Sequence, residues 1–135
     1  MPAVLYILMR NDLASMNPGK AMAQASHASN AFVHNRGRMR EGPMENENLY
    51  LSWKTETTQG FGTVLVLAVD KTEMEQAVAV AKMAEYDTDI IHDPTYPLPD
   101  GEDCHFIPLD TCAYIFGNKD DQVLTAIVQN FPLHE

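Results

Sequence analysis

The sequence of 135 residues has few cysteines, few basic side chains and no long apolar run. Its two cysteines, Cys104 and Cys112, are too few for a disulfide-stabilised scaffold and suit a reducing compartment. No stretch approaches the roughly 20 apolar residues that span a bilayer, so no membrane segment is expected. The first apolar run, Val4 to Met9, has no basic region before it and does not resemble a signal peptide. These features predict a cytoplasmic protein.

Basic residues are scarce: nine Lys and Arg stand against nineteen Asp and Glu, for a net charge of −10 and an isoelectric point near 4.7. Such an acidic chain is not typical of proteins that bind nucleic acid over a broad basic surface. The charge is uneven, because residues 1–54 carry +2 and residues 55–135 carry −12. One positive face in the N-terminal part is therefore one interpretation, and a merely solvated acidic half is the other.

The order of apolar runs and turn-formers predicts one α/β domain over residues 1–135, without linker or internal repeat. Asn17 and Pro18 are suited to be the N-cap and the first residue of the first helix. Strands alternating with helices favour a mixed, largely parallel sheet covered on both faces. We expect strands over residues 4–9, 63–69, 89–93 and 111–117, helices over 20–34, 72–86 and 121–128, a helical turn over 49–54, and loops over 35–48 and 95–103.

The start of the first predicted helix carries the clearest chemical pattern. Lys20, Gln24 and His27 are spaced by four and three residues, which places them along one face of the helix. Gly19 lets the backbone approach a ligand closely, and free amides at a helix N-terminus favour a developing oxyanion. An ammonium, an amide and an imidazole would then converge on one substrate. The plainer interpretation is a solvated polar face.

The same segment resembles the signature of the type 2 peptidyl-tRNA hydrolase family, in which Gly-Lys-x-Ala-Ala-Gln-x-x-His-Ala follows the first strand. Residues 19–28 are Gly-Lys-Ala-Met-Ala-Gln-Ala-Ser-His-Ala, with Met22 in place of the family's first alanine. The resemblance implies a three-layer α/β sandwich with a mixed four-stranded sheet. It also implies hydrolysis of the ester between a peptide and the terminal ribose of tRNA, with peptidyl-tRNA as partner and without metal or cofactor. Analogy with related folds adds a homodimer.

The resemblance also assigns roles to single residues. The family's functional lysine corresponds to Lys20, and its aspartate at the end of the third strand corresponds to Asp93. We expect Lys20 and the helix amides to stabilise the tetrahedral oxyanion. Asp93 is expected to orient or activate water, with a direct pair to Lys20 as one arrangement. Gln24 and His27 would support the substrate or Lys20.

After Asp93 the chain departs from the family pattern. The family continues Ala-Gly-x-Thr-Gln, whereas residues 94–97 are Pro-Thr-Tyr-Pro and an acidic stretch follows. Thr95 and Thr111 are the candidates to replace the family's threonines in substrate binding. The departure supports a second hypothesis: a binding or regulatory module on the same fold, without hydrolase activity.

Three arginines, Arg36, Arg38 and Arg40, alternate after the first predicted helix. They would form a basic patch that offsets the repulsion between the acidic stretch and tRNA phosphates. The competing interpretation is that they pair with the surplus of acidic side chains.

A metal site is a third hypothesis. Its candidate ligands have the right chemistry for zinc, but no close Cys-x-x-Cys or His-x-x-x-His pair is present. The residues concerned are His92, Asp93, Cys104, His105 and Cys112.

Overall fold

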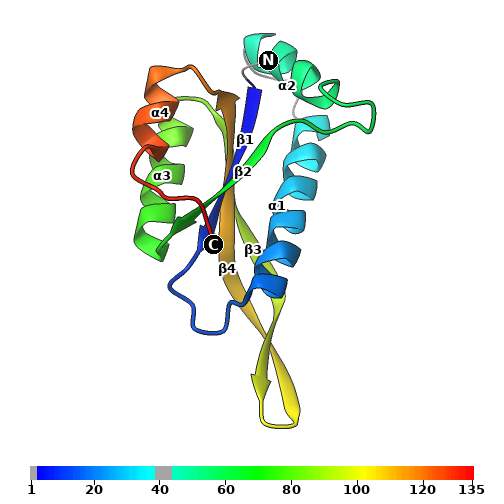
Figure 1. Ribbon diagram of the computed structural model, residues 1–135, viewed down its shortest axis with the longest axis vertical. Helices are drawn as coiled ribbons and strands as arrows, with labels where there is room; N and C mark the ends of the chain where they lie inside the picture. The colour runs from blue at the N-terminus through cyan, green and yellow to red at the C-terminus, as the bar shows by residue number, and fades with distance from the viewer. Residues whose placement is uncertain (1–2, 39–43) are drawn as a thin grey trace.

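The computed structural model describes residues 3–38 and 44–135, which form a sheet between two helical layers (Figure 1). The strands are β1 (Ala3–Arg10), β2 (Val64–Val69), β3 (Asp87–Asp100) and β4 (Asp103–Asn118). The helices are α1 (Pro18–Arg38), α2 (Met44–Lys54), α3 (Lys71–Met83) and α4 (Gln122–Val128). The predicted three-layer α/β sandwich with a four-stranded sheet is confirmed.

The sheet has the strand order β2-β1-β4-β3 and is mixed, as predicted. Only β1 and β2 run parallel, whereas β4 runs antiparallel to both β1 and β3. The expectation of a largely parallel sheet is therefore wrong. The reason is the connection between β3 and β4, a tight turn at Gly101 with φ of +62° in place of a crossover helix. Only antiparallel neighbours can be joined in this way.

The predicted loop over residues 95–103 is also wrong, because most of it belongs to two long strands. β3 has 14 residues and β4 has 16, and their far halves form a two-stranded ribbon that extends beyond the rest of the sheet (Figure 1). Pro97, Pro99 and Gly101, with three acidic residues, made this segment resemble a loop. An edge strand tolerates proline, since its outward N–H groups have no partner in the sheet. β3 is such an edge strand.

β1 is buried along its whole length and supplies side chains to both layers. Alternate residues of the strand point to opposite faces, so Val4 packs toward α3 and α4 while Leu5 packs toward α1 and α2. Phe32 of α1 lies at the centre of an aromatic cluster on the second face, with ring centroids 4.7–5.6 Å from those of Tyr50, Trp53, Tyr114 and Phe116. No helix within the described ranges is long and apolar enough to cross a membrane.

Both helices on this second face are longer than predicted. α1 continues to Arg38 and α2 begins at Met44, within the expected loop over residues 35–48. Tertiary contacts hold the added turn of α1. The side-chain amide of Asn35 donates to the Tyr114 hydroxyl at 3.0 Å, and Arg36 forms an ion pair with Asp87. Such contacts override local propensity and are not visible in a helical pattern.

The segment after α4 returns to the outer edge of β2. The Ala68 amide donates to the Pro132 carbonyl, and the His134 amide donates to the Val66 carbonyl, both at 2.8 Å. An antiparallel bridge joins Leu67 to Leu133 between these two bonds. The C-terminal residues 132–134 therefore pair with the outer edge of β2.

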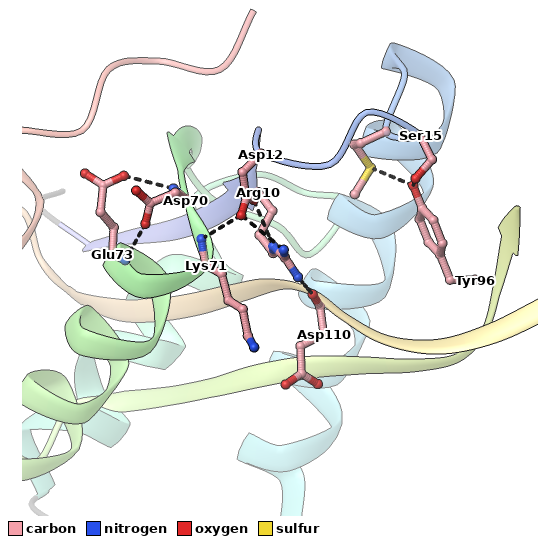
Figure 2. Close-up of polar contacts among 9 residues, drawn as sticks. Arg10, Asp12, Ser15, Asp70, Lys71, Glu73, Tyr96 and Asp110 are labelled. Atoms are coloured by element: carbon pink, nitrogen blue, oxygen red, sulfur yellow. Dashed lines mark hydrogen bonds and ion pairs between the residues drawn. The ribbon is translucent and has the colours of Figure 1, made fainter.

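Arg10, at the end of β1, joins three parts of the fold (Figure 2). Its Nε and Nη2 donate to the two carboxylate oxygens of Asp12 at 2.9 and 3.1 Å, and its Nη1 donates to the Asp110 carbonyl of β4 at 2.9 Å. The Asp12 carboxylate also accepts from the Lys71 amide at the start of α3, at 3.2 Å. These bonds lower the pKa of Asp12 below its ordinary value and fix the segment that leads into α1.

Replacing Arg10 with methionine should lower the free energy of unfolding by about 2–3 kcal/mol at pH 7, since three partly buried hydrogen bonds of a charged group are lost. Urea unfolding followed by the fluorescence of Trp53 would measure the change. Lys119→Met removes an exposed cation and should change the same quantity by less than about 0.5 kcal/mol. Equal effects of the two variants would contradict the anchoring role of Arg10.

Candidate functional site

The first turn of α1 is fixed by the predicted N-cap. The Asn17 carboxamide oxygen accepts from the Lys20 amide at 2.8 Å, and the Asn17 carbonyl accepts from the Ala21 amide at 2.9 Å. The backbone N–H of Lys20 therefore already donates to the side chain of the N-cap residue. Beside it, Gly19 is exposed, and the nearest atom to an added Cβ would be the Asn17 oxygen at 3.5 Å. The space next to this turn is open.

The side chain of Lys20 reaches from α1 to β3. Its Nζ donates to the Pro97 carbonyl at 2.7 Å and lies 5.0 Å from the centroid of the Tyr96 ring. An ammonium has three N–H donors, so two remain after the bond to Pro97. Lys20 is half-buried and keeps these donors near the surface.

Gln24 lies one turn further along α1 and is buried, with 3% of its surface exposed. Its Nε2 donates to Asp93 Oδ2 at 2.7 Å, and its Oε1 accepts from the Thr111 hydroxyl at 2.7 Å. The reverse orientation of the amide would turn its oxygen toward the carboxylate, which is repulsive. Gln24 thus joins α1, β3 and β4 through one oriented amide.

Asp93 is buried and has its carboxylate almost fully engaged. Oδ1 accepts from the amide of Thr95 at 2.9 Å and from its hydroxyl at 3.3 Å, while Oδ2 accepts from Gln24. Burial alone would raise the pKa of Asp93. The hydrogen bonds from Gln24 and Thr95, with the charge of the nearby His27, outweigh it and hold the pKa below the ordinary value. The carboxylate is therefore ionised at neutral pH.

A β-bulge explains why Asp93 and Tyr96 both face α1. Residues three apart on a regular strand point to opposite faces. Here Asp93 pairs with Leu109 and Tyr96 with Ile107, so two residues of β3 lie opposite Pro108 alone. The extra residue restores the same face for both side chains. The carboxylate and the ring then line the strip of β3 that Gln24 and Lys20 contact.

His27 completes the helical face that the sequence predicts. It is exposed and lies three residues after Gln24, whose side chain contacts Asp93, so it lies on the Asp93 side of α1. Within residues 3–38 and 44–135, no hydrogen bond to its ring is present. The imidazole is available to a ligand.

Lys20 and Asp93 thus lie along one side of α1 without touching. Among the described residues, no ion pair joins them. The expected direct pair is not formed because Gln24 and Thr95 occupy the carboxylate, while the Pro97 carbonyl takes the ammonium. The lysine and the carboxylate are held separately, each by its own contacts.

The two candidate threonines occupy different places. Thr95 is exposed beside Asp93, where a substrate would reach it. Thr111 is fully buried behind Gln24 and donates to its amide oxygen, so it fixes Gln24 and does not line the open surface. The motif gives no signal for Tyr96 or for the Pro97 carbonyl, since neither the bulge nor the path of β3 is evident from the sequence.

Arg36 lies far from Lys20. It pairs with Asp87 at 3.1 Å, its side chain is 6% exposed, and its separation of 16 positions from Lys20 corresponds to about 24 Å of helix. Burial raises the pKa of Asp87, although Arg36 opposes this. The pair lines a cleft of about 610 Å³ at the opposite end of α1 from Lys20. The side chain of Arg38 and the whole of Arg40 lie outside the described residues.

The candidate metal ligands are dispersed. Cys112 lies beneath Gln24, where burial raises the pKa of its thiol to about 12, and His92 pairs with Asp110 at 2.9 Å. Cys104 and His105 lie on the projecting ribbon. In the part of the chain that the structure describes, no three His, Cys, Asp or Glu side chains gather as a metal centre requires.

Comparison with known proteins bears on the fold and on the family. A solved structure of a protein of unknown function from Agrobacterium tumefaciens is similar, with a TM-score of 0.59 at 11% identity over 100% of this chain and 99% of that one. At this identity the similarity concerns the fold alone. No curated protein in the comparison matches the chain significantly. The sequence profile of the family described as peptidyl-tRNA hydrolase PTH2 matches residues 3–131, so the chain belongs to the type 2 peptidyl-tRNA hydrolase family.

Proposed function

We propose that the protein hydrolyses the ester that joins a peptide to the terminal ribose of tRNA, and that it does so in the cytoplasm. The observation that carries the proposal is the 2.7 Å bond between Gln24 of the family motif and Asp93 at the third strand. It brings the two parts of the sequence resemblance into one site. Membership of the family supports the same reaction.

Lys20 is assigned to the oxyanion. When water attacks the ester carbonyl carbon, negative charge develops on the carbonyl oxygen. The two N–H donors of Lys20 that the Pro97 carbonyl leaves free would stabilise that charge. The open space beside Gly19 leaves room for the ester close to the ammonium.

His27 is assigned as general base. A carboxylate with a lowered pKa is a weak base, so Asp93 is poorly suited to take the proton itself. His27, in its neutral form, removes a proton from the attacking water. Collapse of the tetrahedral intermediate breaks the bond to the ribose oxygen, which takes that proton. The products are tRNA and a peptide carboxylic acid, which ionises by losing its proton to solvent, and the route requires no metal or cofactor.

Further substrate contacts are assigned to side chains that are exposed near these residues. The Thr95 hydroxyl lies beside Asp93 at the surface and is assigned to the peptide or the terminal ribose. Contacts of Arg38 and Arg40 with tRNA phosphates remain a prediction, as does the homodimer. Arg36 would first have to leave Asp87.

Lys20→Met should lower kcat by about 10²–10³-fold, the usual effect of removing one oxyanion donor. The measurement is release of a radiolabelled N-acetylated amino acid from its tRNA, with circular dichroism to verify folding. Lys71→Met, which removes an exposed lysine elsewhere, should keep wild-type turnover.

Unchanged turnover in Lys20→Met would refute the role of the lysine. If the wild-type protein itself released nothing but bound the same tRNA, the second hypothesis, a binding module on this fold, would replace the hydrolase.

Gln24→Leu leaves the Asp93 carboxylate and the Thr111 hydroxyl without their shared partner, and should lower the free energy of unfolding by about 2–4 kcal/mol at pH 7. The loss should depend on pH. Because the folded pKa of Asp93 lies below the ordinary 3.8, its ionised form adds stability above that value, and the contribution disappears as the pH falls through the folded pKa.

The difference in the free energy of unfolding between Gln24→Leu and the wild type should therefore decrease from about pH 4 downward. Urea unfolding between pH 7 and pH 3 would measure it. Gln76→Leu, an exposed glutamine of α3, serves as control and should cost less than about 0.5 kcal/mol throughout. A loss of equal size at every pH would show that Gln24 does not act through the ionised carboxylate.

A further inference from the structure

The ring of Tyr96 lies under the Lys20 ammonium and is fully buried, with 0% of its surface exposed. The ammonium lies 5.0 Å from the ring centroid, within the range in which the face of an aromatic ring attracts a cation. The next residue, Pro97, supplies the carbonyl that accepts from the same ammonium at 2.7 Å. Two consecutive residues of β3 therefore hold Lys20 by ring and backbone.

The ring itself is fixed from the other side. Its hydroxyl lies 3.0 Å from Ser15 Oγ, with which it shares a hydrogen bond (Figure 2). It also donates to Met16 Sδ at 3.9 Å. Both partners belong to the segment that leads from β1 into α1. Tyr96 thereby ties the start of the motif helix to the strand that it faces. The bulge after Asp93 is what turns the ring toward α1.

We propose that Tyr96 is a positioning residue, which holds the Lys20 ammonium in place for the reaction. The inference rests on the proposed function, in which Lys20 stabilises the oxyanion. A lysine side chain has several rotatable bonds and loses much conformational freedom when it is fixed. Contacts that fix it before the substrate binds remove that cost from the reaction step.

The test replaces the ring while sparing the lysine. Tyr96→Leu should lower kcat by about 10–100-fold and leave KM within about 3-fold, since a misplaced catalytic group slows the step without changing binding. Tyr96→Phe keeps the ring and should retain most of the activity. Tyr114→Leu is the matched control: Tyr114 is also a buried tyrosine, but it bonds to Asn35 at the far end of α1. It should keep kcat in the folded protein.

A double-mutant cycle separates positioning from general stability. In a Lys20→Met background, Tyr96→Leu should cause no further loss of kcat, because the group it positions is absent. A loss of the same factor in both backgrounds, or a loss in Tyr114→Leu as large as in Tyr96→Leu, would overturn the inference. Tyr96→Met, closer in volume to the tyrosine, takes the place of Tyr96→Leu if the latter does not fold.

A measurement without substrate makes the two proposals separable. Protons on the ε-carbon of Lys20, bonded to the Nζ that lies over the ring, should show an upfield ring-current shift by NMR. The shift should persist in Tyr96→Phe and Tyr114→Leu and vanish in Tyr96→Leu. Its absence from the wild-type protein would overturn the inference whatever the activity. A wild-type protein that shows the shift but releases no peptide would overturn the proposed function, while confirming that Tyr96 holds Lys20.

Discussion

The side-chain amide of Gln24 is the contact on which the arrangement of the site depends. A buried carboxylate is costly unless hydrogen bonds satisfy it, and Gln24 supplies one of those that Asp93 accepts. The amide is itself oriented by the Thr111 hydroxyl, so α1, β3 and β4 are fixed relative to one another by a chain of two bonds. Lys20 and His27 stand one turn before and one turn after Gln24. The buried link therefore fixes the helix that carries both side chains against the sheet.

Features that depend on neighbouring residues could be predicted from the sequence. The apolar run of β1, the cap at Asn17 and the common face of Lys20, Gln24 and His27 follow from spacing alone. The ribbon over residues 94–108 could not be predicted in this way. Its strands exist because they pair with each other across a two-residue turn, while its prolines argue for a loop when considered singly.

The partners of the charged residues were the part of the site that the sequence predicted least well. The motif identifies Lys20, but the carbonyl and the ring that hold it depend on one extra residue in β3. Arg36 shows the same limit, because its charge suggests phosphate binding while the fold places it against Asp87. A sequence shows which groups carry charge. Tertiary distance decides which of them remain available to a substrate.

The pairing of residues 132–134 with β2 affects the tendency of this protein to aggregate through its edge strands. An uncovered edge strand presents free main-chain groups that can template aggregation. The outer edge of β2 is occupied in part by the returning chain. The opposite edge, β3, contains three prolines, each without an N–H to offer. The molecule thus limits sheet extension at both margins by different means, which disfavours aggregation through strand pairing.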